Sequence, residues 1–176
     1  MLINLSDVMS DRHETVDETV ELNMDMFQSK AGQFPIVRKN PVRIRVEHVR
    51  GKEMLIYVQT DLDIEIPCDR CLKEVRQKFV LDIKKHIDLE VPDDKLTEEL
   101  DESNFIIDGY NLDVDKLLYN EILIGWPVKV LCREDCRGIC SICGQNLNEG
   151  FCNCEDTGLD PRMSVVRDLF KNFKEV

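Results

Sequence analysis

The fold is decided by one stretch of the chain, residues 56–89, which reads IYVQTDLDIEIPCDRCLKEVRQKFVLDIKKHIDL. Apolar and polar residues alternate on both sides of its central segment Pro67-Cys68-Asp69-Arg70-Cys71-Leu72. Alternation with a period of two is typical of half-buried antiparallel strands. The stretch therefore predicts a long β-hairpin that carries a Cys-x-x-Cys pair at its tip.

Further strands are predicted around this hairpin. The same alternation covers residues 20–26 and 42–46. Residues 105–107 make one more short strand, which the turn pair Asp108-Gly109 closes. Strict alternation in all of these segments favours an antiparallel sheet, either open or barrel-like.

Two helices are predicted after the strands. Asp113 can cap one that ends near Trp126-Pro127. The second begins at Asp160, with Pro161 at its first position, and carries an apolar stripe along one side. We therefore predict an α+β fold with two C-terminal helices. We divide it into a β-rich body, residues 1–130, and a cysteine-rich tail with the last helix, residues 131–176.

The cysteines are the most unusual feature of the chain. There are eight: Cys68, Cys71, Cys132, Cys136, Cys140, Cys143, Cys152 and Cys154. The N-terminal sequence has no basic segment followed by an apolar run, and no apolar run reaches the roughly 18 residues of a membrane span. We therefore expect a cytoplasmic protein that is not in a membrane. In a reducing compartment, clustered cysteines are more often zinc ligands than disulfides.

The spacing of the cysteines predicts one zinc ion and allows two. Cys140-x-x-Cys143 and Cys152-x-Cys154 make the best four-sulfur site, with Gly144 where a tight turn needs positive φ. The other four would form a second site that fastens the tail to the body. Their tail members, Cys132 and Cys136, have a spacing that suits one helical turn. Two alternatives remain: Cys136 could replace Cys154 in the first site, or the tail cysteines could be free, partly buried thiols.

Charge narrows the range of partners. The chain has a formal net charge of −12, which disfavours general binding to nucleic acid because phosphate contacts need Lys and Arg. It suits a basic partner, or a partner held by one local basic face. Residues 38–52 offer such a face, with a single acid, Glu47, and six basic residues: Arg38, Lys39, Arg43, Arg45, Arg50 and Lys52. This strip could contact an RNA backbone or be an ordinary solvent face, and it contains no aromatic residue for base stacking.

Enzymatic motifs are absent from the sequence. It has no Gly-rich phosphate loop, no His-Glu-x-x-His motif and no nucleophile elbow. Cys68 and Cys71 could in principle form a redox dithiol. Such dithiols, however, begin a helix, whereas this pair lies between two predicted strands. We therefore expect a protein that is not an enzyme.

Several of these motifs together resemble the YceD family. The resemblance rests on the Pro67–Leu72 segment, on Trp126-Pro127, on the run from Cys132 to Asn148, on Cys152-x-Cys154 and on Asp160-Pro161-Arg162. It implies a bacterial factor that promotes accumulation of 23S rRNA and assembly of the large ribosomal subunit. Its partner would be an rRNA precursor or a basic large-subunit ribosomal protein.

Two functions of other classes remain open. One is a redox-switched zinc holdase chaperone, because such proteins bind zinc through the same two motifs, Cys-x-x-Cys and Cys-x-Cys, in the reverse order along the chain. A thiol oxidoreductase using Cys68 and Cys71 is the other alternative.

Overall fold

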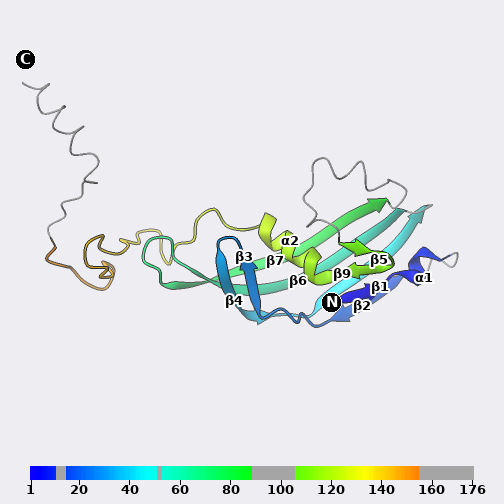
Figure 1. The fold of residues 1–176 in the computed structure, drawn as a ribbon, viewed down its shortest axis with the longest axis horizontal. Helices are drawn as coiled ribbons and strands as arrows, with labels where there is room; N and C mark the ends of the chain where they lie inside the picture. The colour runs from blue at the N-terminus through cyan, green and yellow to red at the C-terminus, as the bar shows by residue number, and fades with distance from the viewer. Residues whose placement is uncertain (11–14, 51–52, 89–105, 155–176) are drawn as a thin grey trace, which may run out of the picture.

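The computed structural model describes residues 1–10, 15–50, 53–88 and 106–154. Its longest unit is the hairpin of β6 (Glu53–Pro67) and β7 (Glu74–Asp88), which pair antiparallel along their whole length. In Figure 1 the tip of this hairpin extends past β3 and β4 and meets the cysteine-rich segment. The predicted hairpin is therefore confirmed.

A second long row lies along the other edge of β6. It consists of β4 (Gly32–Lys39) and β5 (Val42–Arg50), which are both antiparallel to β6 and so run in the same direction. The row is interrupted at Asn40 and Pro41, where the register against β6 shifts because proline cannot donate a ladder hydrogen bond. Asn40 stays attached to β6 because its N–H donates to the carbonyl of Asp61 (3.0 Å). The two strands thus act as one bent strand.

The outermost row consists of β2 (Val16–Val20), which pairs with β5, and β3 (Met26–Ser29), which pairs with β4. The single strand predicted over residues 20–26 is wrong, because residues 21–25 lie outside both strands. Leu22 is nevertheless buried in the core. Among the described residues, β7 pairs with β6 alone and not with the outermost row, so the sheet is open and the barrel-like alternative is wrong.

A smaller sheet has the order β1-β9-β8. Its strands are β1 (Leu2–Asn4), β8 (Ile107–Asp108) and β9 (Asn111–Asp113). The predicted turn at Asp108-Gly109 joins β8 to β9, and Gly109 has a φ of 59° that glycine adopts without strain. The predicted strand residue Phe105 lies outside the described residues. A short helix that the sequence did not predict, α1 (Ser6–Met9), follows β1.

The first predicted helix is confirmed as α2 (Val114–Ile124). The Asp113 carboxylate accepts a hydrogen bond from the N–H of Lys116 (3.2 Å), and the helix ends at Gly125. The second predicted helix, from Asp160, lies outside the described residues. In the described part of the chain α2 is the one helix with more than four residues, and no helix there has the length and apolar character to cross a membrane.

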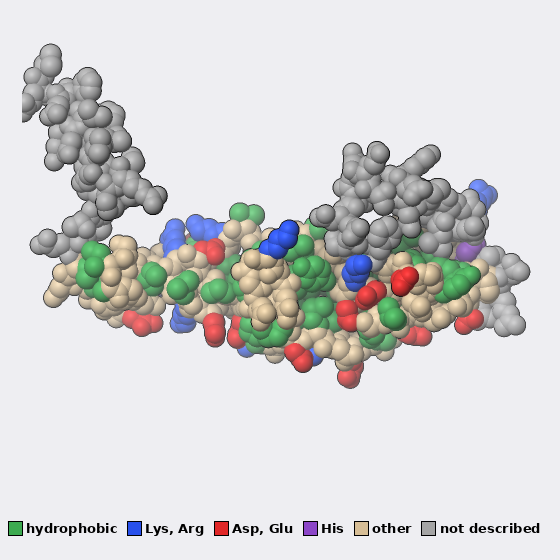
Figure 2. Space-filling view, viewed as in Figure 1, with side chains coloured by type: hydrophobic (Ala, Val, Ile, Leu, Met, Phe, Trp, Pro, Cys, Tyr) green, Lys and Arg blue, Asp and Glu red, His purple; other side chains and the backbone are tan. Residues whose placement is uncertain are grey.

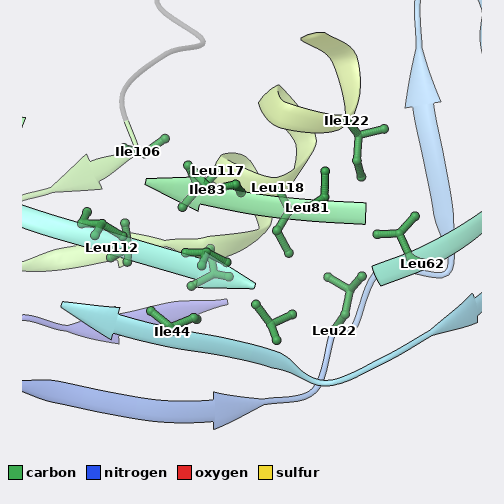
Figure 3. Packing of buried hydrophobic residues seen from close by; sticks show 14 of the residues in the cluster. Leu22, Ile44, Leu62, Leu81, Ile83, Ile106, Leu112, Leu117, Leu118 and Ile122 are labelled. Carbon is green, nitrogen blue, oxygen red and sulfur yellow. The ribbon is translucent and has the colours of Figure 1, made fainter. Parts of the chain in front are cut away.

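The core lies between the sheet and α2. Figure 3 shows Leu117 and Leu118 of the helix directed toward Leu81 and Ile83 of β7. Past the end of α2, the ring of Trp126 packs against Phe27 and Phe34, with centroids 5.0 Å apart in both pairs. Figure 1 shows the following segment continuing toward the hairpin tip. The aromatic cluster therefore fixes the point from which the cysteine-rich tail departs.

Candidate functional site

The tip of the β6–β7 hairpin forms a tight knuckle around Cys68. The N–H of Cys68 donates to the carbonyl of Lys73 (2.8 Å), and the N–H of Leu72 donates to the carbonyl of Cys68 (2.9 Å). These bonds turn both sulfurs to the same side, where Cys68 is fully buried and Cys71 is 7% exposed. The knuckle thus presents two thiols with the spacing that metal sites use.

The two residues between these cysteines hold the tail against the tip. Asp69 exchanges two hydrogen bonds with Val130: the N–H of Val130 donates to Oδ2 (2.7 Å), and the N–H of Asp69 donates to the Val130 carbonyl (2.9 Å). The guanidinium of Arg70 donates to the Cys136 carbonyl (2.7 Å), and the Arg70 carbonyl accepts from the N–H of Ile139 (3.1 Å). Asp69 and Arg70 thus attach the tail to the tip, a role that the sequence did not reveal although both residues lie inside the Cys-x-x-Cys motif.

The first group of sulfurs is shared by the tip and the tail. The Sγ atoms of Cys68, Cys71, Cys132 and Cys136 all lie within 4.8 Å of one another. Cys68 and Cys136 are 3.8 Å apart, and Cys71 and Cys132 are 3.5 Å apart. Four thiolates about 2.3 Å from a tetrahedral zinc ion lie roughly 3.8 Å from each other, whereas a disulfide needs about 2.05 Å. The donor set and its spacing therefore fit a structural zinc ion.

Cys132 and Cys136 do not lie on a helical turn, as their spacing suggested. They flank a short turn in which the N–H of Cys136 donates to the carbonyl of Arg133 (3.1 Å). The helical prediction fails because the residues around this turn are also held by hydrogen bonds to the hairpin tip, such as the one from Arg70 to the Cys136 carbonyl, and form no continuous helical ladder.

The second group consists of Cys140, Cys143, Cys152 and Cys154, whose Sγ atoms also lie within 4.8 Å of one another. The N–H of Cys140 donates to the carbonyl of Gln145 (2.8 Å), and its sulfur accepts from the N–H of Ile142 (3.4 Å). This group is more open to solvent than the first, because Cys143 is exposed and Phe151 is 80% exposed. The sequence allowed either Cys154 or Cys136 as the fourth cysteine of this group. The structure has Cys154 in that place.

Asn148 connects the two groups, and the sequence analysis missed it as well. It lies between the two cysteine pairs of the second group, yet its side-chain amide donates to Sγ of Cys136 in the first (3.3 Å). Its Oδ1 accepts from the N–H of Arg137 and from the guanidinium of Arg133, both at 2.8 Å. Groups that hydrogen-bond to ligand atoms orient them and tune metal affinity. Asn148 therefore makes the second loop part of the surroundings of the first site.

The thiols of each group differ in acidity. Burial opposes ionisation of Cys68, but the N–H groups of Arg70, Cys132 and Cys71 outweigh it and lower the pKa of this thiol to about 6. Burial and the neighbouring thiols raise the pKa of Cys132 to about 12. Because negative charges this close repel one another, four sulfurs ionise together only around a cation.

The second group divides in the same way. The N–H groups of Cys143 and Ile142 lower the pKa of the Cys140 thiol to about 6. The hydrogen bond to Cys143 and burial raise the pKa of the Cys154 thiol to about 12. In both groups the first cysteine of the Cys-x-x-Cys motif has a lowered pKa, and in the first group the pKa of Cys136 is lowered as well.

The basic strip predicted over residues 38–52 is interleaved with acidic residues. Arg38 lies 3.5 Å from Asp61, Lys39 lies 2.6 Å from Asp25, and Arg45 lies 2.5 Å from Glu47. Arg43 shares the outer face of β5 with Arg45, as predicted, and Arg50 ends that strand. Lys52 lies outside the described residues. The face of the molecule that Figure 2 shows also carries both acidic and basic side chains.

The structure adds an aromatic ring beside this strip. Tyr57 of β6 is the register partner of Arg45, and it lines a shallow surface hollow. The other lining residues come from three neighbouring strands: Asp17, Arg43, Arg45, Glu47 and Gln59. The sequence analysis missed Tyr57 because the ring comes from a different strand, which only the pairing register brings next to Arg45.

Comparisons with known proteins bear on most of the chain. The sequence model of the family described as "Large ribosomal RNA subunit accumulation protein YceD" matches residues 56–170. An uncharacterized protein of Mycobacterium leprae (strain TN) is 27% identical over 104 residues, which cover 59% of this chain and 47% of that protein. The chain thus spans about half the length of this curated relative. No solved structure matches this chain.

Proposed function

This chain belongs to the YceD family of large ribosomal RNA subunit accumulation proteins, and from that membership we propose that it is a ribosome-assembly factor. It would act in the cytoplasm by binding, without catalysis, and promote accumulation of 23S rRNA and biogenesis of the large subunit. Its partner would be an rRNA precursor or a basic ribosomal protein. The observation that carries the proposal is the family match, which includes most of the hairpin and both cysteine groups.

The role that we assign to the cysteines is structural. Each group would hold one Zn²⁺, and the metal would supply a rigid crosslink and no reactive water, because four protein thiolates complete its coordination. The first site would join the hairpin tip to the tail through Cys68, Cys71, Cys132 and Cys136. The second would order residues 140–154, a segment in which Ile142 and Phe151 are exposed and cannot form a core.

The redox alternatives have less support. A thiol oxidoreductase needs an accessible thiolate. Cys68, the acidic thiol of the hairpin tip, is fully buried, and Cys71 is nearly so. A redox-switched holdase would use the second group, because Cys143 is exposed. Peroxide treatment distinguishes a holdase from an assembly factor. A holdase would release zinc, form disulfides and then suppress aggregation of an unfolded client protein. An assembly factor would not gain that activity.

The proposal is tested by depletion and by sedimentation. Cells without the protein should accumulate less 23S rRNA relative to 16S rRNA, and the tagged protein should sediment with large-subunit precursors. The double variant Arg43→Glu and Arg45→Glu should lose this association while its fold is retained, because both side chains lie on the outer face of the sheet. Normal 23S rRNA levels after depletion would contradict the proposed function. Unchanged association of the double variant would remove the basic strip from it.

A further inference from the structure

The outer face of the sheet carries a row of side chains around one aromatic ring. The register places Asp17 of β2 opposite Arg45 of β5, Arg45 opposite Tyr57 of β6, and Tyr57 opposite Lys84 of β7. The ammonium of Lys84 lies over the ring of Tyr57, 5.4 Å from its centroid. Lys84 does not line the hollow, so the ring borders the hollow on its β5 side. Tyr57 thus lies between a cation and an open, polar hollow.

The charges around the hollow do not suit a phosphate backbone. Its lining includes two cations, Arg43 and Arg45, and two carboxylates, Asp17 and Glu47. A groove that follows a nucleic-acid backbone is lined by cations, because each phosphate is negative. An aromatic ring flanked by both hydrogen-bond donors and carboxylates instead matches the edge of a nucleobase, which is neutral and carries donors and acceptors side by side.

Guanine is the base whose edges fit this set. Its O6 and N7 are acceptors that take paired hydrogen bonds from an arginine. Its N1–H and its amino group are donors that a carboxylate accepts. Adenine offers a donor where guanine has O6, and it lacks a proton on N1, so the same arginine and carboxylate would face unmatched groups. Uracil offers the arginine no second acceptor beside its carbonyl.

We propose that the hollow binds an unpaired guanine of single-stranded RNA, an inference that rests on the proposed function and names its ligand. Tyr57 stacks on the base, and Arg45 donates to its O6 and N7. Asp17, which faces Arg45 across the β2–β5 pair, accepts from its N1–H and amino group. Arg43 of β5 pairs with Gln59 of β6 in the register. Both line the hollow, on the side where a flanking phosphate would lie.

The test measures binding of labelled short oligouridine probes to the full-length protein by fluorescence anisotropy. The probes carry guanosine, adenosine or uridine at one central position. The guanosine probe should bind about tenfold more tightly than the other two, since recognition of one base edge contributes roughly that factor. The affinity should depend weakly on salt, with a slope near that of one or two phosphate contacts, about −0.7 each.

Variants assign the effect to the hollow. Tyr57→Ala should weaken binding of the guanosine probe about tenfold through loss of stacking, while Tyr57→Phe should keep most of it. Arg45→Met keeps the aliphatic stem and should abolish the preference for guanosine. Val80→Ala is the matched control. Val80 is 69% exposed, lies on β7 like Lys84, and does not line the hollow. Thermal unfolding of each variant tests whether it is folded.

Two results would overturn the inference: equal binding of the three probes by the wild-type protein, or folded Tyr57→Ala and Arg45→Met variants that both behave like wild type. The proposed function is judged separately, by sedimentation with large-subunit precursors. If that association persists without any preference for guanosine, the inference is wrong and the proposed function stands.

Discussion

Leu72 and Gly144 occupy the same position in two knuckles with matching backbone hydrogen bonds. Each follows the second cysteine of a Cys-x-x-Cys motif, and each has positive φ, 60° for Leu72 and 73° for Gly144. The N–H of each donates to the carbonyl of the first cysteine of its motif, at 2.9 Å in both knuckles. One has the glycine that this conformation favours, and the other has a leucine that is 64% exposed.

This relationship predicts opposite effects of two substitutions. Leu72→Gly should raise the free energy of unfolding by about 1 kcal/mol, because relief of the left-handed strain exceeds the added entropy of the unfolded chain. Gly144→Ala should lower the zinc affinity of the second site about tenfold, although a Cβ there would meet nothing within 4 Å. Urea unfolding and chelator competition measure the two effects. A destabilised Leu72→Gly protein would indicate that the leucine packs in a way the structure does not show.

Metal content and its removal give a second prediction. We expect two zinc ions per chain by native mass spectrometry, and one in Cys143→Ser, which disrupts the second group alone. Chelation should remove amide protection at Ile139, whose N–H donates to the carbonyl of Arg70 at the hairpin tip, but leave β5 protected. The reason is that the main apolar core is separate from the cluster around the cysteines. Complete unfolding on chelation would contradict this separation.

Asn148 provides a third prediction. Asn148→Asp should lower the zinc affinity of the first site about 10- to 100-fold, because it replaces a donor to Cys136 Sγ with a negative charge. Asn23→Asp is the matched control, since Asn23 is exposed in the segment between β2 and β3. Competition with a calibrated zinc chelator measures the difference. Equal affinities of the two variants would show that Asn148 does not act on the first site.

The attachment of the tail at Asp69 provides a fourth. Asp69→Ala would leave the N–H of Val130, a residue that is 4% exposed, without its acceptor, and should cost about 1–3 kcal/mol of unfolding free energy. Asp69→Asn keeps an acceptor for the Val130 N–H, so the loss of unfolding free energy should be clearly smaller. Urea unfolding with zinc present compares the two. If both variants lose the same amount, the charge of Asp69 matters more than its hydrogen bond.

A fifth prediction concerns pH. The hydrogen bond from Asn40 and the nearby charges of Lys78 and Arg38 hold the pKa of Asp61 below its ordinary value of 3.8. Because its folded pKa is the lower one, Asp61 stabilises the protein above the unfolded pKa, and this contribution is lost as the pH falls through the folded pKa. Asp61→Asn should therefore lower the thermal unfolding temperature at pH 7 and have less effect near pH 3. A difference that does not change with pH would show that the charge of Asp61 contributes nothing.

The sequence by itself determined the local structures. Alternation predicted β6, β7 and β5, because the side chains of a strand point to opposite faces whatever lies around it. Asp113 marked the start of α2, because a cap is a contact over three residues. The Cys-x-x-Cys spacing likewise predicted two knuckles. The same local signal failed over residues 20–26, where alternation continued through residues 21–25, which lie outside both strands.

Only the tertiary structure decided which distant residues meet. It brought Asn148 to Cys136 and Tyr57 to Arg45, neither of which the sequence indicated. It also decided that the sheet stays open, since β7 has a single partner strand among the described residues. The physical reason is that these contacts depend on pairing register and on the path of the chain past Trp126. Both follow from packing of the whole core, which the spacing of neighbouring residues does not encode.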